Sequence, residues 1–268
     1  MATQTPSTPT PLTAGTGTAF GVDVGGSGIK GALVDLATGE FIGDRLKILT
    51  PQPATPDAVA ATVVELVRRF DWEGPVGLTL PSVIRGQTAL SAANIDPSWI
   101  GTDITELFRR HLPGREVVAL NDADAAGLAE VAYGEEASRH GSVIFLTFGT
   151  GIGSAFLLDG RLFPNTEVGH MLVNYQGTVD EAEHLASSAA KDREELSYKK
   201  WAKRVDVVLA EFQALFNPQL FIVGGGISRN HDKWLPRLEI ATPVIPAKLR
   251  NRAGIVGAAM AVTDHLAP

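Results

Sequence analysis

The sequence predicts an α/β fold with two domains that face each other across a cleft. Two glycine-rich strings, Asp23–Lys30 and Thr147–Ser154, each lie between two apolar or β-branched runs, as the turn of a β-hairpin does. After each string, strand patterns and helical patterns alternate along the chain, so the same plan occurs twice. A duplicated plan of this kind favours two α/β domains with a ligand site between them.

The first half begins with three expected strands, at 20–24, 29–36 and 41–48, where apolar and β-branched residues dominate. A helix is expected after Thr55, which is an N-cap residue followed by proline and aspartate in the first helical turn. The other elements expected in this half are a strand at 76–80, a helix near 103–112, a strand at 117–120 and an alanine-rich helix at 122–133.

The second half repeats the plan after the second glycine string. Its expected elements are strands at 143–148, 155–158, 161–163 and 220–223, and helices near 180–190, 198–216 and 255–266. We therefore expect an N-terminal domain at 19–121, joined by the C-terminal helix of about 255–268, and a C-terminal domain at 122–254. Residues 1–18 contain seven Thr, three Pro and no charged residue, so a disordered tail is expected there.

Composition and charge exclude several classes of protein. The net charge of −7 argues against a broad cationic face for nucleic acid. A cysteine count of zero excludes disulfides, iron–sulfur clusters, a cysteine nucleophile and zinc sites built on thiolates. No apolar stretch approaches the ~18 residues needed to cross a bilayer. We expect a cytoplasmic protein that has neither nucleic acid nor a membrane as its partner.

The two glycine strings predict a phosphate held from both sides of the cleft, because glycine lets backbone N–H groups approach an anion closely. The chain therefore resembles a phosphoryl-transfer enzyme in its chemistry. The expected phosphate-binding residues are Gly25, Gly26, Ser27, Lys30, Thr147, Gly149, Thr150 and Gly151. Lys30 is a candidate phosphate clamp, with a solvated strand lysine as the alternative. A third string, Gly224, Gly225 and Gly226, either admits a nucleoside or simply ends a strand.

Phosphoryl transfer to a sugar hydroxyl needs a carboxylate that accepts the proton, and usually Mg²⁺. Asp122 follows a strand and begins a helix, where a carboxylate points into a cleft, and the alternative is a helix N-cap. Asp23 lies within an apolar strand, where a carboxylate is costly unless it is paired or near a metal. It is our candidate for Mg²⁺, directly or through water, and a turn-stabilising aspartate is the alternative.

Two further motifs suggest ligand binding. Glu167 and His170 are three residues apart, so an acceptor and a donor for vicinal sugar hydroxyls lie near one another, although a surface turn has the same pattern. Positive charge gathers in 191–204, with six Lys and Arg against three Asp and Glu, and in 233–252, with five against one. The cations Lys199, Lys200, Lys203 and Arg204 lie on a helix as either a solvated face or a track for a long polyanion.

Taken together, these strings resemble the ROK family of sugar kinases, a branch of the actin-like (ribonuclease H-like) ATPases. Asp23–Lys30 is similar to the first phosphate motif of the family, Thr147–Ser154 to the second and Ile222–Ser228 to its nucleoside motif. The resemblance implies that Asp122 is the catalytic base. It also implies a set of residues that hold the sugar, namely Asn94, Asn121, Glu167, His170 and Glu183.

One departure from the family pattern narrows the resemblance. Most ROK kinases have a cysteine-rich zinc motif after the Glu-x-Gly-His string, whereas this chain has 173–178 without cysteine, so no zinc is expected. This feature, the lysine-rich helix and the ending 253–259 resemble the polyphosphate glucokinase branch and, within it, enzymes that use polyphosphate or ATP for glucose and mannose. The alternatives are an ATP-only hexokinase of the same fold and a non-catalytic sugar-binding regulator. The sequence leaves a homodimer open.

Overall fold

The computed structural model describes residues 17–263, which form two five-stranded sheets with the same strand order. In each sheet the first three strands are an antiparallel meander and the others pair in parallel. The first sheet has the order β3-β2-β1-β4-β7, from β1 (Thr18–Gly25), β2 (Gly28–Asp35), β3 (Glu40–Ile48), β4 (Val76–Leu80) and β7 (Val117–Asn121). The second has the order β10-β9-β8-β13-β14, from β8 (Ser142–Phe148), β9 (Ile152–Leu158), β10 (Arg161–Phe163), β13 (Leu220–Gly224) and β14 (Val244–Pro246). The duplicated α/β plan is confirmed.

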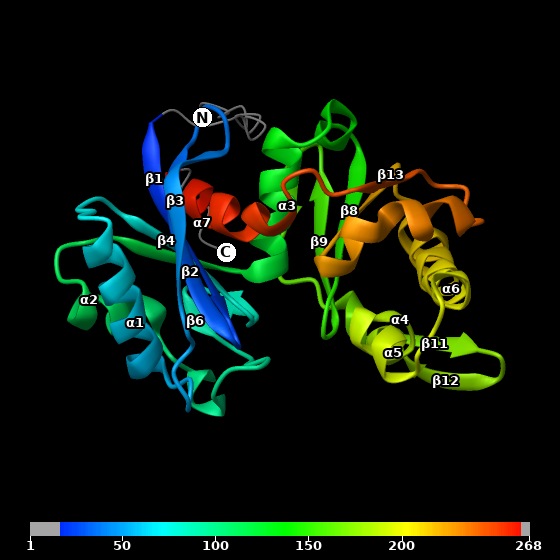
Figure 1. Cartoon of the computed structure of the whole chain (residues 1–268), viewed down its shortest axis with the longest axis horizontal. Coiled ribbons are helices and arrows are strands. Elements are labelled where there is room, and N and C mark those ends of the chain that lie inside the picture. Colours follow the sequence, from blue (N-terminus) through cyan, green and yellow to red (C-terminus); the bar gives the residue numbers. More distant parts are fainter. Residues whose placement is uncertain (1–16, 264–268) are drawn as a thin grey trace, which may run out of the picture.

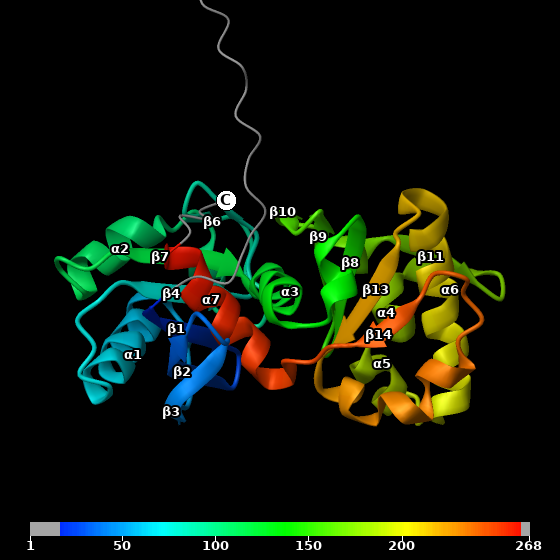
Figure 2. The ribbon, with the colours of Figure 1, turned by 90° about the horizontal axis from the view of Figure 1, so that it is seen from above.

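Helices cover both faces of each sheet. Figure 1 shows α1 (Pro56–Arg69) and α2 (Ile104–His111) outside the first sheet, and we call this unit the N-terminal lobe. The second sheet with α4 (Ala182–Ala186), α5 (Ser188–Arg193) and α6 (Tyr198–Phe216) is the C-terminal lobe. Between the sheets lie α3 (Asp122–Tyr133) and α7 (Ala253–Thr263), side by side in Figures 1 and 2. Three apolar cores result, one within each lobe and one between the sheets.

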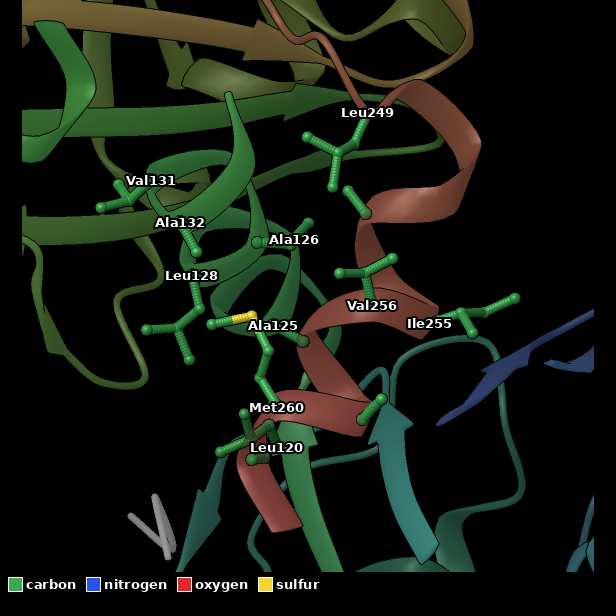
Figure 3. Close-up of a cluster of buried hydrophobic side chains, with 14 of the residues drawn as sticks. Leu120, Ala125, Ala126, Leu128, Val131, Ala132, Leu249, Ile255, Val256 and Met260 are labelled. Atoms are coloured by element: carbon green, nitrogen blue, oxygen red, sulfur yellow. The ribbon is translucent and has the colours of Figure 1, made fainter. Parts of the chain in front are cut away.

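The two central helices approach their neighbours closely because small residues line them. A Cβ on Gly257 of α7 would lie 1.8 Å from the carbonyl oxygen of Ala125 of α3. A Cβ on Gly77 of β4 would lie 1.7 Å from the carbonyl oxygen of Ala258. The glycines therefore let α7 pack directly on the first sheet and on α3. Figure 3 shows the apolar side chains that fill this contact, including Leu120, Leu128, Leu249, Val256 and Met260.

A buried carboxylate fastens the segment that leads from the second sheet into α7. Glu130 of α3 is 2% exposed, and its two oxygens accept the backbone N–H groups of Lys248 and Leu249 at 2.9 and 2.7 Å. Charge-assisted bonds of this kind offset the cost of burying the carboxylate. The chain thus returns to the N-terminal lobe along a path that α3 fixes.

Several short elements were not predicted from the sequence. They are the hairpin β5 (Ile84–Arg85) and β6 (Thr88–Ala89), the hairpin β11 (Leu172–Tyr175) and β12 (Thr178–Glu181), and the edge strand β14. The helix expected near 180–190 is divided into α4 and α5 because Ser187 caps the second helix, accepting from the N–H of Ala190 at 3.1 Å. The short 3₁₀ turns are η1 (Pro97–Trp99), η2 (Glu136–Arg139), η3 (Val168–His170), η4 (Gly226–Lys233), η5 (Leu235–Arg237) and η6 (Arg250–Arg252).

The ends of the chain differ in part from the expectation. The first strand begins at Thr18, so the expected tail of 1–18 is wrong at that residue, because Thr18 pairs with Asp35 of β2. Gly17 is also described, and its carbonyl accepts the N–H of Leu36 at 2.9 Å, whereas residues 1–16 and 264–268 lie outside the described residues. Within 17–263, no helix has both the length and the apolar character that a membrane span requires.

Candidate active site

Asp122 lies where the last strand of the first sheet passes into α3. The helix cap that the sequence left open for Asp122 belongs to its neighbour Asn121, whose side-chain oxygen accepts the N–H groups of Ala123 and Asp124 at 2.9 and 3.2 Å. The amide nitrogen of Asn121 donates to the carbonyl of Ser82 at 3.2 Å. Both ends of the Asn121 amide therefore position the backbone. The Asp122 side chain is exposed to solvent, and one of its oxygens also accepts the N–H of Ala123 at 2.8 Å.

The surroundings of Asp122 disfavour its charge even though solvent reaches it. Dense protein on its other sides raises the pKa of Asp122 to about 6, and the negative charges of Asp23 and Glu167 contribute to the rise. One turn further along α3, burial raises the pKa of the fully buried Asp124 to about 7. Asp122 is thus a solvent-accessible carboxylate that titrates near neutrality, as a general base does.

Asp23 and Lys30 form an ion pair across the first hairpin. The two residues are register partners in β1 and β2, and the Lys30 ammonium lies 2.7 Å from the Asp23 carboxylate. The other oxygen of Asp23 accepts from the hydroxyl of Thr79 at 3.2 Å. Asp23 is therefore held by strand neighbours instead of by turn amides, and Lys30 is not a freely solvated lysine. The start of α7 also lies here, since a Cβ on Gly254 would be 3.8 Å from the Asp23 carboxylate.

The first glycine turn joins β1 to β2 and lies against the segment that contains Asn94. A Cβ on Gly26 would lie 2.8 Å from the backbone oxygen of Asn94, so only glycine permits this approach. Asn94 itself is exposed, with a φ of 60°. The structure therefore brings the turn of Gly25, Gly26 and Ser27 against Asn94 through Gly26.

The second glycine turn joins β8 to β9 and lies beside the start of α3. A Cβ on Gly153 would be 3.1 Å from the Cβ of Ala123, the residue after Asp122. On the other side, a Cβ on Gly151 would be 2.3 Å from an oxygen of Glu183, which accepts the N–H of Ile152 at 3.2 Å. The turn of Thr147, Gly149, Thr150 and Gly151 is thus placed between Asp122 and Glu183.

The third glycine string, Gly224, Gly225 and Gly226, packs against the end of β8, next to the second glycine turn. Gly225 has a φ of 82°, and a Cβ there would lie 2.4 Å from the backbone oxygen of Phe148. Its neighbour Gly226 has open space around it, and Gly224 ends β13. The predicted nucleotide residues and the second phosphate turn are therefore adjacent, although they are far apart in sequence.

Glu167 and His170 lie on the loop and turn that follow β10. Both are exposed. Burial in part and the negative charge of Glu183 raise the pKa of Glu167, against the effect of His170. A hydrogen bond from Nδ1 of His170 to Glu181, at 2.8 Å, raises the pKa of the imidazole. His170, Glu181 and Glu183 place ligand atoms within 4.8 Å of one another, an imidazole and two carboxylates that could hold a cation.

The predicted cationic track is divided between free and paired side chains. Lys199, Lys200 and Lys203 are exposed along α6. Arg204 instead forms an ion pair with Glu194, and its nitrogen donates to the backbone of Leu185 at 3.2 Å. Its charge is therefore already engaged by neighbours on the protein.

Sequence reasoning missed three residues that join the two basic segments. The ammonium groups of Lys191 and Lys233 lie 4.8 and 5.5 Å from the ring centre of Tyr198. Lys191 comes two residues after Ala189, whose N–H donates to the carbonyl of Gly149 at 3.1 Å. Lys233 ends the turn that begins at the third glycine string. The charge count of the two segments was the signal, but only the fold shows that Lys191 and Lys233 converge on one ring.

Comparison with known proteins identifies the family. Residues 19–184 match the ROK family model. The chain is 56% identical over 242 residues to the polyphosphate glucokinase of Mycobacterium tuberculosis (strain CDC 1551 / Oshkosh), covering 90% of each, and 53% identical to that of Mycobacterium leprae, covering 91% of this chain and 74% of the relative.

Solved structures agree with these sequence matches. The inorganic polyphosphate/ATP-glucomannokinase from Arthrobacter sp. strain KM matches with a TM-score of 0.84 and 47% identity, over 92% of this chain and 99% of that one. A ROK family glucokinase from Streptomyces griseus in complex with glucose and AMPPNP matches with a TM-score of 0.75 and 25% identity, over 92% and 100%. The predicted two-domain actin-like ATPase fold is confirmed by these matches, and the chain belongs to the ROK family.

Proposed function

We propose that this chain transfers a phosphoryl group from inorganic polyphosphate or ATP to the 6-hydroxyl of glucose and mannose. The observation that carries the proposal is Asp122, a solvent-accessible carboxylate whose pKa is raised to about 6 and whose helix start lies beside the second glycine turn. A base of this pKa is ionised at neutral pH and still accepts a proton readily. The names of the relatives support the donor and the sugar.

In the proposed reaction, Asp122 accepts the proton of the sugar 6-hydroxyl. At the same time, the oxygen of that hydroxyl attacks the terminal phosphorus of the donor. The bond between that phosphorus and the bridging oxygen of the donor breaks, and the shortened donor leaves with the electron pair. We assign sugar binding to Asn94, Glu167, His170 and Glu183, whose amide, carboxylates and imidazole match vicinal hydroxyls. Asn121 was predicted to bind sugar as well, and its engaged amide supports a positioning role instead.

We assign Mg²⁺ to the region of Asp23. Asp23 offers hard oxygen ligands for the ion, directly or through water. When bound, the ion neutralises charge on the transferred phosphoryl group. Lys30, ion-paired with Asp23, would shift toward phosphate oxygens, and the backbone amides of both glycine turns would cradle them.

For the donor, we propose that Gly224, Gly225 and Gly226 admit the nucleoside of ATP and that cations on α5, α6 and η4 hold polyphosphate. The convergence of Lys191 and Lys233 on Tyr198 supports this, because two like charges near one ring favour an anion in the same place, and polyphosphate would compete there with Asp192, which pairs with Lys191 at 3.2 Å. Lys199, Lys200 and Lys203 would extend the track along α6. Arg204 adds least, since Glu194 already pairs with it.

The test of the base is Asp122→Asn. We expect the turnover number to fall by roughly 10²- to 10⁴-fold, because the amide cannot accept the proton, while glucose binding measured by calorimetry remains. Asp57→Asn is the matched control, since Asp57 is an exposed aspartate in the first turn of α1, in the N-terminal lobe. A near-normal rate in Asp122→Asn would refute the assignment.

The proposal also covers the cellular location and the oligomeric state of the protein. We propose a cytoplasmic location, since a cysteine count of zero suits a reducing compartment and the donors are cytoplasmic metabolites. A homodimer stays a prediction, which sedimentation of the purified chain would test.

A further inference from the structure

The loop that holds Glu167 is tied to the rest of the molecule by its neighbour Asn165. Asn165 follows β10 by two residues and has a φ of 60°, in the left-handed region that asparagine tolerates better than most residues. In this conformation its backbone and its side chain point at two different elements. Neither element belongs to the sheet that the loop comes from.

The side-chain amide of Asn165 pairs with the backbone of the N-terminal lobe. Its nitrogen donates to the carbonyl of Ile84 at 2.7 Å, and its oxygen accepts the N–H of Ile84 at 2.8 Å. Ile84 belongs to β5 and is fully buried. Both polar groups of this buried residue are thus satisfied by one side chain from the other lobe, so losing it would leave them unpaired.

The backbone N–H of Asn165 donates to the Asp124 carboxylate at 2.7 Å. Asp124 is fully buried on α3, two residues after the proposed base Asp122. The N–H of Asp124 in turn donates to Asn121, and Asn121 donates to Ser82, two residues before Ile84. These bonds close a ring that runs from α3 through the loop and β5 and back to α3.

We propose that Asn165 is a positioning residue for the sugar, which fixes the Glu167 loop against both α3 and β5. The inference rests on the proposed function, because it takes Glu167 as a sugar ligand. Glu167 is two residues from Asn165, and its charge reaches Asp122, so the ring sets the distance between the residue that binds the sugar and the residue that activates it. The sugar then meets a loop that is already ordered, which lowers the cost of binding.

The variant Asn165→Gly tests this directly, because glycine keeps the left-handed backbone and the N–H while it removes the amide. We expect the KM and the dissociation constant for glucose to rise roughly tenfold or more, as two bonds to buried groups are lost. The turnover number and the KM for the donor should change much less, since bound sugar restores the loop.

The chain supplies a matched control in Gln87→Gly. Gln87 also has a φ of 60°, and its side-chain amide pairs with both backbone groups of Ala119, at 3.1 and 2.8 Å. That pair joins the β5–β6 hairpin to β7 within the N-terminal lobe, so the control loosens the same hairpin without removing the bonds between Asn165 and Ile84. Both glycine variants should lose similar stability, but only Asn165→Gly should weaken glucose binding.

A second variant covers the case in which Asn165→Gly does not fold. Asn165→Asp keeps the acceptor for the Ile84 N–H but places a carboxylate oxygen against the Ile84 carbonyl, so it should weaken glucose binding in the same way. Glucose affinity is read by calorimetry on the full chain. Wild-type chain that binds no glucose would refute the proposed function, whereas folded Asn165 variants with unchanged glucose affinity would refute only the positioning role.

Discussion

The raised pKa of Asp122 predicts an acid limb in the pH dependence of the reaction. Only the ionised carboxylate accepts the proton of the sugar hydroxyl. With a pKa of about 6, about nine tenths of Asp122 is ionised at about pH 7 and about a tenth at about pH 5. We therefore expect kcat/KM to be roughly tenfold lower at the acidic pH. An aspartate at its ordinary pKa of 3.8 would lose almost nothing over the same range.

The assay is initial-rate formation of glucose 6-phosphate over this range of pH, with saturating donor. Ionisation of the donor's terminal phosphate could also produce a limb, so a variant must separate the two causes. Glu167→Gln removes a negative charge that raises the pKa of Asp122, and its residual activity should show a limb at lower pH. Full activity at about pH 5, or a limb that stays in place in this variant, would refute the reasoning.

Three further predictions follow from the packing and the charges. Folding raises the pKa of Asp124 from 3.8 to about 7, so the folded state holds the proton across this window and stability is lost as the pH rises through it. Between about pH 5 and 8, wild type should therefore lose about 2 kcal/mol more unfolding free energy than Asp124→Asn does, as measured by urea melts. An equal loss in both proteins would contradict this prediction. Gly257→Ala should cost about 1–3 kcal/mol of stability, because its methyl would meet the Ala125 carbonyl, whereas Gly254→Ala in the same helix has room for a methyl and serves as the control. Replacing Lys199, Lys200, Lys203 and Arg204 by glutamine should raise the KM for long polyphosphate far more than that for ATP, with Arg109 and Arg110 of α2 changed likewise as the control, and equal losses for both donors would count against the track.

Much of the fold could be predicted because the signals are local. The helix after Thr55 has the predicted cap, and the alanine-rich α3 and the long α6 have the expected bounds, although their caps are Asn121 and Ser197, which were not predicted. The short hairpins β5–β6 and β11–β12 could not be predicted, since pairs of two to four residues carry no periodic pattern. The domain boundaries stay a prediction, and α3 packs against α7 as well as against the second sheet.

The candidate site was predictable where a motif carries it, and not where the partners are distant in sequence. Asp122, Asp23 and the glycine turns stand in recognisable strings, and the structure brings them together. The roles of Asn121 and Asn165 depend on contacts with Ser82 and Ile84, which no local pattern reveals. Positive φ and side-chain amide pairing are properties of the folded backbone, so they become visible only with the structure.

The most direct test of this account is formation of sugar 6-phosphate by the purified chain with Mg²⁺ and nucleotide-free polyphosphate as the sole donor, followed by the same assay with ATP. The account predicts product from polyphosphate with glucose and with mannose, and product from ATP as well. Product from ATP alone would mean that the lysines of α6 are only a solvated face without a role in donor binding, and it would support the ATP-only alternative. No product from either donor would contradict the proposed kinase.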